Sequence, residues 1–284
     1  MARITSVPNP PLSVSDGARA AAPWIERFAR TGYVAKGIVY IVIGTLAARA
    51  AFGAGGRTTG SRGAMETIVE QPFGRVMLAV IAVGLLGYAI WQLIAAAADT
   101  ERKGTEPKGL ALRAGQAGRA LIYASLALSA VRLTMGDRSG GGDDAAAAGW
   151  TARLMAVPFG RWLVALVGLG IIGYGVYQLY RAWAAKVRKH LDLWQASATE
   201  AEWIVRVGRF GIGARGVVFG IIGWFLIRAA MEYEPRRASG LAGALATLER
   251  QPYGPWLLGI VALGLIAYGL YQLANARYRR ITAG

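Results

Sequence analysis

The chain has 284 residues, of which 55% are apolar and 17% charged, with a mean hydropathy of +0.37 and a formal net charge of +16. Soluble domains carry about a quarter charged residues, so scarce charge with a basic excess indicates a membrane protein whose basic loops face anionic lipid. A nucleic-acid-binding protein would gather its basic residues on one soluble face, whereas here they interrupt apolar runs, and the lack of cysteine excludes disulfides and thiolate metal sites.

Residues 1–23 are polar and rich in proline, and we expect them to form a disordered cytoplasmic tail. The first apolar segment then begins at Arg30-x-Gly32-x-x-x-Lys36 and ends at Arg49. The twelve uncharged residues between Lys36 and Arg49 rise roughly 18 Å in a helix, which is short of a hydrocarbon core of about 30 Å. The two basic side chains therefore either extend to the interfaces, which we favour, or point into the bundle.

A short amphipathic stretch, residues 64–70, follows and is expected to lie flat at the outer interface. The step Gln71-Pro72-Phe73-Gly74-Arg75 leads from it into Val76–Ala98, which contains no charge and is long enough to cross the membrane. A proline near the start of this helix is favourable, because its missing N–H would have no partner there.

The same order of elements returns twice, with offsets of 86 and 94 residues for both the proline step and the second helix. The second apolar helices of the later copies are Trp162–Tyr180 and Trp256–Ala276, the stretch 241–250 repeats the amphipathic segment, and the glycine-rich loop 136–149 is expected to be flexible. The predicted division of the chain is a tail over 1–23 and membrane repeats over 24–106, 107–195 and 196–284.

These repeats predict an all-α membrane protein with six transmembrane helices, arranged as three tandem two-helix units. Because each unit crosses twice, all three enter the membrane in the same direction, which favours pseudo-threefold symmetry about the membrane normal. The N- and C-terminal segments and the loops on their side hold 20 of the 32 Lys and Arg residues. The positive-inside rule therefore predicts that both termini are cytoplasmic.

With these motifs assembled, the chain resembles the bacterial family called domain of unknown function 1206. The resemblance is carried by the Arg-x-Gly-x-x-x-Lys/Arg entry, the Gln-Pro-Phe-Gly-Arg step and the Gly-Tyr-x-x-aromatic-Gln ending, over roughly residues 24–280. Val157 and Pro255 depart from the pattern of the step. The resemblance implies an integral protein of the bacterial cytoplasmic (inner) membrane and carries no activity or cofactor.

Each second helix presents a glycine, a tyrosine and a glutamine at a spacing of four residues, and therefore on one face. The three sets are Gly84, Tyr88, Gln92; Gly170, Tyr174, Gln178; and Gly264, Tyr268, Gln272. We interpret this face as helix-packing contacts within each hairpin, in preference to a ligand site. On that interpretation, Gly173→Leu should destabilise the protein more than Leu169→Ala.

The basic residues of the first helices recur at two levels and are the candidate contacts for lipid or anions. The inner set is Lys36, Arg119 and Arg215, and the outer set is Arg49, Arg132 and Arg228. Under threefold symmetry each set forms a ring. A basic ring can select anions, or its members can anchor short helices to lipid phosphates, which we favour. The lone histidine, His190, is expected to be solvated beside neighbouring cations.

The sequence thus predicts a non-enzymatic structural, accessory or lipid-interacting membrane protein, with membrane lipids and other membrane subunits as partners. The alternative is a passive pathway for a small anion or solute along the threefold axis. We expect no catalytic residues, no metal, no cofactor and no nucleic acid, because no nucleophile–base pair, phosphate loop or mid-membrane carboxylate is present in the sequence.

Overall fold

A computed structural model describes residues 14–97, 106–184 and 197–278, and every regular element in these ranges is helical. The elements are α1 Val14–Ala51, α2 Ser61–Val69, α3 Gly74–Ala97, α4 Pro107–Thr134, α5 Asp143–Met155, α6 Gly160–Trp183, α7 Ala198–Glu232, the 3-10 helix η3 Pro235–Arg237, α8 Leu241–Glu249 and α9 Gly254–Tyr278. The prediction of an all-α fold is confirmed over this part of the chain. His190 lies outside the described residues.

The second helix of each repeat is α3, α6 or α9, and each begins two residues before its predicted start. The difference arises at the proline step, where the aromatic residue ends the turn and the following glycine is already helical. Phe73, Phe159 and Tyr253 each adopt a left-handed backbone conformation with φ of 60°, which is uncommon for residues other than glycine. The three copies of the step therefore adopt the same backbone conformation.

The glycine after each of these aromatic residues is required by space. A Cβ atom on Gly74 would lie 2.1 Å from the carbonyl oxygen of Ile68, and one on Gly160 would lie 1.9 Å from that of Leu154. No side chain fits at such distances, so glycine lets the second helix begin directly against the end of the short helix before it.

The first helices, α1, α4 and α7, are 38, 28 and 35 residues long. The expectation of short helices between the two basic positions is therefore wrong, because the helix continues toward the N-terminus past the entry motif in every repeat. The prediction of a disordered tail is also wrong over residues 14–23, where α1 has already begun. This stretch is alanine-rich, and alanine has the highest helix propensity.

The short helices α2, α5 and α8 each connect a first helix to a second helix, and together we call them the cap. The acidic residues at the start of α5 connect this helix to α2 and α8. The Asp144 carboxylate accepts hydrogen bonds from the backbone N–H groups of Gly240 and Gly243 at 2.7 and 3.2 Å, and Asp143 accepts one from the backbone of Arg62 at 3.4 Å. Carboxylates from one helix thus serve the N-terminal N–H groups of two others, where the helix dipole favours negative charge.

The expectation that residues 136–149 form a flexible loop is wrong from Asp143 onward, because α5 occupies that part.

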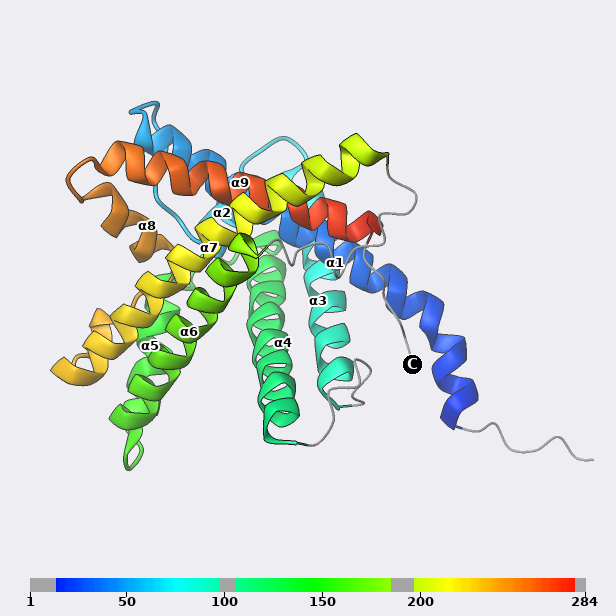
Figure 1. The fold of residues 1–284 in the computed structure, drawn as a ribbon, viewed down its shortest axis with the longest axis horizontal. Helices are drawn as coiled ribbons and strands as arrows, with labels where there is room; N and C mark the ends of the chain where they lie inside the picture. The colour runs from blue at the N-terminus through cyan, green and yellow to red at the C-terminus, as the bar shows by residue number, and fades with distance from the viewer. Residues whose placement is uncertain (1–13, 98–105, 185–196, 279–284) are drawn as a thin grey trace, which may run out of the picture.

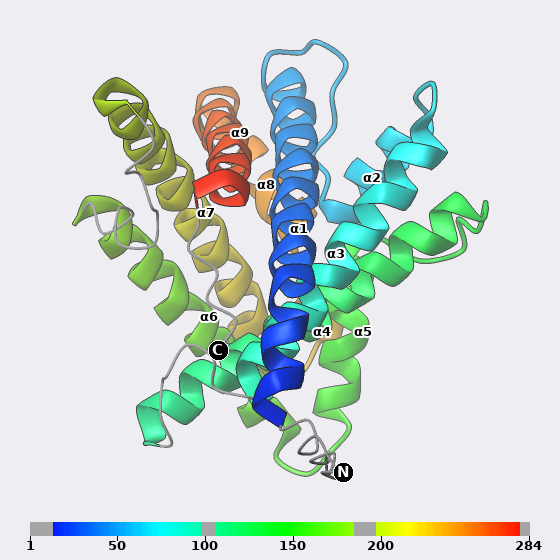
Figure 2. The same ribbon diagram turned by 90° about the vertical axis from the view of Figure 1, so that its right-hand side faces the viewer.

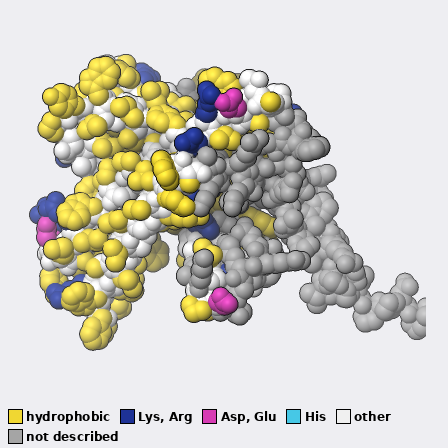
Figure 3. All heavy atoms as spheres, in the orientation of Figure 1, with side chains coloured by type: hydrophobic (Ala, Val, Ile, Leu, Met, Phe, Trp, Pro, Cys, Tyr) yellow, Lys and Arg dark blue, Asp and Glu magenta, His cyan; other side chains and the backbone are white. Residues whose placement is uncertain are grey.

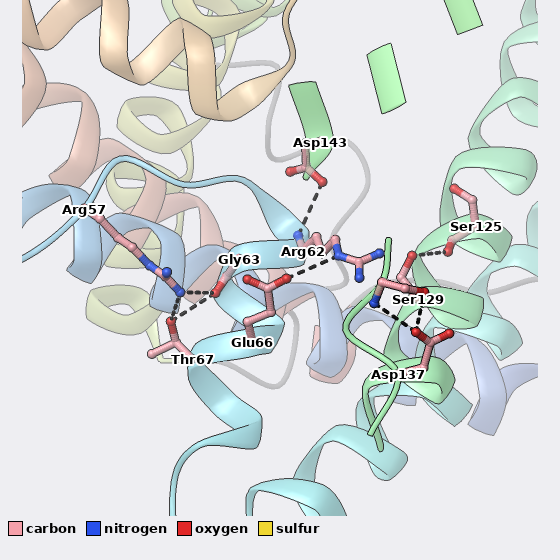
Figure 4. A network of polar contacts seen from close by, with 10 residues as sticks. Arg57, Arg62, Gly63, Glu66, Thr67, Ser125, Ser129, Asp137 and Asp143 are labelled. Atoms are coloured by element: carbon pink, nitrogen blue, oxygen red, sulfur yellow. Dashed lines mark hydrogen bonds and ion pairs between the residues drawn. The ribbon is translucent and has the colours of Figure 1, made fainter. Parts of the chain in front are cut away.

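Partial burial raises the pKa of the Asp143 carboxyl above its ordinary value, although hydrogen bonds from the backbone of Arg62 and Ser61 oppose the shift. Figure 4 shows this side of the cap, where Arg62 donates to Glu66 at 3.2 Å and Arg57 donates to Gly63 and Thr67. The Arg57 bonds fasten the loop after α1 to α2, and the Arg62–Glu66 pair lies within α2.

The long helices pack as three close pairs, each formed by the second helix of one repeat and the first helix of the next. These pairs are α3 with α4, α6 with α7, and α9 with α1, and they lie side by side in Figures 1 and 2. The pairs are joined by packing of α1 on α3 and of α7 on α9, which are contacts within repeats 1 and 3. The main apolar core is buried where these helices and the cap meet, around Ile43, Met65 and Leu245.

The corresponding contact within repeat 2 is much weaker, since α4 and α6 are not among the described helix pairs that pack closely. We call this gap the α4–α6 seam. The six long helices therefore form a ring that is open at one position, and the two helices on either side of the opening belong to the same repeat.

Within the described ranges, five helices are long and apolar enough to cross a membrane: the Arg30–Ala51 part of α1, and α3, α6, α7 and α9. The helix α4 has 28 residues but carries Gln116 and Arg119 inside its apolar stretch. The described surface in Figure 3 is mostly hydrophobic, with Lys and Arg confined to small groups. These apolar helices and the hydrophobic surface are compatible with a protein that crosses a membrane several times.

Candidate functional site at the inner cations

The first arginine of each entry motif binds the end of a second helix in another repeat: repeat 2 binds repeat 1, repeat 3 binds repeat 2, and repeat 1 binds repeat 3. Arg113 donates to the carbonyl oxygens of Ala96 and Ala97 at 2.7 and 3.0 Å, at the C-terminal end of α3. The equivalent arginines make the same kind of bond: Arg209 to Ala182 and Trp183 of α6, and Arg30 to Ala276 and Arg277 of α9. Helix C-termini have four carbonyl groups without internal partners and favour cations, so these three arginines join successive repeats.

The inner cations lie six residues further along the first helices, roughly 9 Å from that level. Lys36 is only 5% exposed, so the favoured interpretation that its side chain extends to the interface is wrong. Its Nζ atom lies 5.0 Å from the centre of the Tyr123 ring and 5.3 Å from that of Tyr88. Aromatic ring faces attract cations, and here they replace the hydration that Lys36 loses.

Arg215 is held by hydroxyl groups and rings from two other helices. Its guanidinium donates to the hydroxyls of Tyr268 at 2.8 Å and Tyr40 at 3.2 Å, and it lies 4.6 Å from the ring of Phe219. Arg119 lines the same space as Tyr174 of α6. Its Nε atom is buried and has no hydrogen-bond partner among the described residues, so the cluster retains an unsatisfied charged donor.

The aromatic partners repeat with the helix pairs. Edge-to-face contacts join Tyr40 to Tyr268 at 4.8 Å, Tyr88 to Tyr123 at 4.7 Å and Tyr174 to Phe219 at 5.3 Å between ring centres. Each contact connects the tyrosine of a second helix to the aromatic residue four positions after the inner cation of the next first helix. The sequence analysis did not identify Tyr123 or Phe219, although an aromatic residue at the same offset in all three repeats was a usable signal.

The inner cations line a cavity of about 500 Å³ at the α4–α6 seam, which we call the seam cavity. Lys36, Arg119 and Arg215 come from three different repeats and all contribute to its wall. The rest of the lining is mainly apolar or glycine, including Leu112, Ile122, Leu126, Gly115, Gly118, Gly170 and Ile171. A volume of this size is typical of a small-molecule site.

A smaller polar pocket of about 90 Å³ shares the three inner cations with the seam cavity. Its other lining residues include Gln178, Arg181, Gln272 and Asn275, from the final turns of α6 and α9. Among the described residues that line the two spaces there is no Asp or Glu. The site is therefore apolar toward the seam, polar toward the helix ends, and positively charged where these regions meet.

The outer arginines are placed differently from the inner set. Arg49 donates to the carbonyl of Ala54 just after its own helix, and Arg228 forms an ion pair with Glu232 one turn away at 2.8 Å. Arg132 is exposed on α4. None of these three lines the seam cavity or the polar pocket, so the structure brings together the inner set but not the outer set.

Of the predicted packing face, the glycines of repeats 1 and 3 lie at close crossings. A Cβ atom on Gly84 would be 2.8 Å from the carbonyl of Thr31, and one on Gly264 would be 2.2 Å from the Cβ of Ala214. Gly170 differs, because a Cβ there would meet no atom of the described part of the chain within 4 Å, and the same holds for Gly173. The expectation of hairpin packing at Gly170 is wrong, because the described parts of α4 and α6 do not pack closely. The open space beside Gly173 argues against a severe effect of Gly173→Leu.

The tyrosines and glutamines of this face contribute more to the site than to hairpin packing. Tyr88, Tyr174 and Tyr268 line the polar pocket, as do Gln178 and Gln272. Gln92 donates to Tyr88 one turn earlier on its own helix at 3.1 Å. Gln178 accepts a hydrogen bond from Arg181, and Gln272 accepts one from Asn275.

Comparison with known proteins gives one family and one close relative. The model of a family described as Domain of Unknown Function (DUF1206) matches three segments, residues 31–99, 114–185 and 210–279. An uncharacterized protein, YxxB, from Bacillus subtilis (strain 168) is 40% identical over 260 residues, which cover 92% of this chain and 93% of that protein. No solved structure matches the chain.

Proposed function

Because this chain belongs to the DUF1206 family, whose description assigns no activity, we propose its function from the geometry of the seam cavity. It is a non-enzymatic integral membrane protein that holds an anionic lipid against the inner cations. The observation that carries this proposal is that Lys36, Arg119 and Arg215 line one cavity whose described lining contains no carboxylate.

Three cations gathered around one cavity favour an anionic ligand, because the described lining of that cavity contains no carboxylate. Removing a charge from water is costly unless it is paired or hydrogen-bonded, and ring faces and tyrosine hydroxyls compensate only partly. The buried Nε of Arg119 supports the same conclusion, because a phosphate oxygen can accept its hydrogen bond. Arginine and lysine together are typical of phosphate recognition.

A lipid fits the shape of the site better than a passing ion does. The conducting path for an ion needs polar groups along its length, whereas the seam cavity has an apolar wall next to its cations. An amphiphile has a charged end and an apolar end, which match the two regions. The alternative of a passive anion pathway along a threefold axis therefore has less support. For catalysis, the described lining offers no carboxylate or histidine that could act as a general base.

The membrane arrangement that accompanies this function has six spans with pseudo-threefold symmetry, in the cytoplasmic membrane of a bacterium and with both termini cytoplasmic. Five apolar helices, the equivalent arginine caps and the three aromatic contacts support it. For α4 as the sixth span, the support is its length, since 28 residues rise about 42 Å. Its polar Gln116 is only 1% exposed and so avoids lipid.

The test is retention of lipid by the protein purified in mild detergent and analysed by native mass spectrometry. The wild type should retain anionic phospholipid in preference to phosphatidylcholine, and Arg119→Ala should reduce that retention at least tenfold. Arg132→Ala is the matched control, because it removes an exposed arginine from the same helix. Equal retention by both variants, or no preference for anionic lipid in the wild type, would contradict the proposal.

A further inference from the structure

We infer that the α4–α6 seam is the groove for an acyl chain of an anionic phospholipid whose phosphate lies against Lys36, Arg119 and Arg215. This inference rests on the proposed function and adds to it the ligand class, the route by which the lipid enters and the part of the fold that its chain completes.

The first argument is a comparison of equivalent positions in the three repeats. A Cβ on Gly32 would lie 2.4 Å from the Cβ of Tyr88, and a Cβ on Gly211 would lie 2.3 Å from the backbone nitrogen of Tyr268. For the equivalent residue of repeat 2, Gly115, a Cβ would meet no atom of the described residues within 4 Å. The small residues that allow close crossing of the two helices in repeats 1 and 3 therefore border unfilled space in repeat 2.

The second argument is the chemistry of the walls of the seam. Leu112 and Ile122 on α4 line the seam cavity and are 47% and 58% exposed, while Gly170 and Ile171 line it from α6. Between two membrane helices the surrounding solvent is hydrocarbon, so an apolar opening at this place is filled by lipid chains. An acyl chain restores the van der Waals contacts that α4 and α6 do not give each other.

The third argument is continuity between the groove and the charges. The seam cavity reaches the inner cations, and those cations also line the polar pocket. A phosphate at the cations can accept hydrogen bonds from arginine and lysine. The remaining polar part of a headgroup then faces Gln178 and Asn275 in the polar pocket. One phospholipid thus occupies both spaces in a single orientation.

The experiment fills the groove without changing its charge. Gly170→Leu adds a side chain where a Cβ meets nothing within 4 Å, on a residue that lines the seam cavity. Gly173→Leu is the matched control, because a Cβ there is equally free of contacts, the residue lies on the same helix, and it does not line the cavity. Binding of phosphatidylglycerol, phosphatidylcholine and inorganic phosphate to the full-length protein is measured by native mass spectrometry.

Gly170→Leu should weaken phosphatidylglycerol binding at least tenfold and leave phosphate binding unchanged, whereas Gly173→Leu should resemble the wild type. Equal binding of phosphatidylglycerol by both leucine variants would overturn the inference. In that case the proposed function would still stand if Arg119→Ala lost its anionic lipid. Should Gly170→Leu fail to fold, Gly118→Leu on the opposite wall, also in open space, replaces it. If Arg119→Ala retained as much anionic lipid as the wild type, the proposed function itself would be rejected.

Discussion

The entry motif has three positions whose residue type recurs in every repeat, and each position has its own role in the structure. The first arginine binds the C-terminal carbonyls of a helix in the neighbouring repeat, the glycine permits a close crossing in repeats 1 and 3, and the second basic residue faces the seam cavity. The sequence predicted the positions by their recurrence but not these roles. The partner of Arg30, for example, is a backbone carbonyl 246 residues away, and a carbonyl leaves no signal in a sequence.

The role of the first arginine leads to a prediction about stability. Arg113→Ala removes two hydrogen bonds to α3 carbonyls that then lack a partner, and hydrogen bonds to charged groups contribute about 1.5–3 kcal/mol. We expect the free energy of unfolding to fall by about 1–3 kcal/mol. A lower midpoint of thermal unfolding in detergent measures the change.

The control for Arg113→Ala is Arg206→Ala. Arg206 pairs with Glu202 one turn away, and both side chains are more than 60% exposed, so the loss should be at most about 0.5 kcal/mol. If the two variants unfold at the same temperature, the bonds of Arg113 to α3 contribute nothing beyond an exposed ion pair.

At the level of elements, the second helices were predicted to within a few residues because an uncharged apolar run leaves no alternative in a membrane. The cap was predicted less well, because α5 begins in a glycine- and alanine-rich stretch that resembles a linker. Its helix is supported by Asp144, which bonds to backbone groups of α8 about a hundred residues later. Such tertiary support overrides local composition.

The contrast between repeats gives a prediction about helix crossings. Gly264→Ala places a Cβ 2.2 Å from that of Ala214, so α7 and α9 must move apart. Overpacking of this kind costs about 1–3 kcal/mol. Gly170→Ala occupies the equivalent position in open space and should be neutral or gain up to about 1 kcal/mol from helix propensity.

Thermal unfolding of the two alanine variants, side by side in the same detergent, measures the difference. Equal destabilisation by Gly264→Ala and Gly170→Ala would mean that α4 and α6 are in contact in solution. That result would also remove the groove on which the acyl-chain inference depends.

At the level of the whole molecule, the sequence predicted the family and the three repeats, and both are found. It did not predict the open seam, because the motif of repeat 2 matches those of repeats 1 and 3. The opening is a property of the assembled ring: α4 is held by α3 and α6 by α7, in pairs that join different repeats. Local patterns specify these contacts one at a time and do not indicate which of the remaining crossings will form.

The arrangement of the whole chain in the membrane gives the last prediction, which turns on α4. Glu106 immediately precedes α4, and Gly142 lies in the loop after it, with open space where its Cβ would be. Both residues are exposed, and the chain has no cysteine, so Glu106→Cys and Gly142→Cys each introduce a unique thiol. In intact cells an impermeant maleimide should label Gly142→Cys, whereas Glu106→Cys should react only after permeabilisation, because the basic side faces the cytoplasm. A reporter fused after Gly284 should read cytoplasmic. The reverse labelling would invert the topology, and labelling of both cysteines in intact cells would show that α4 does not cross the membrane.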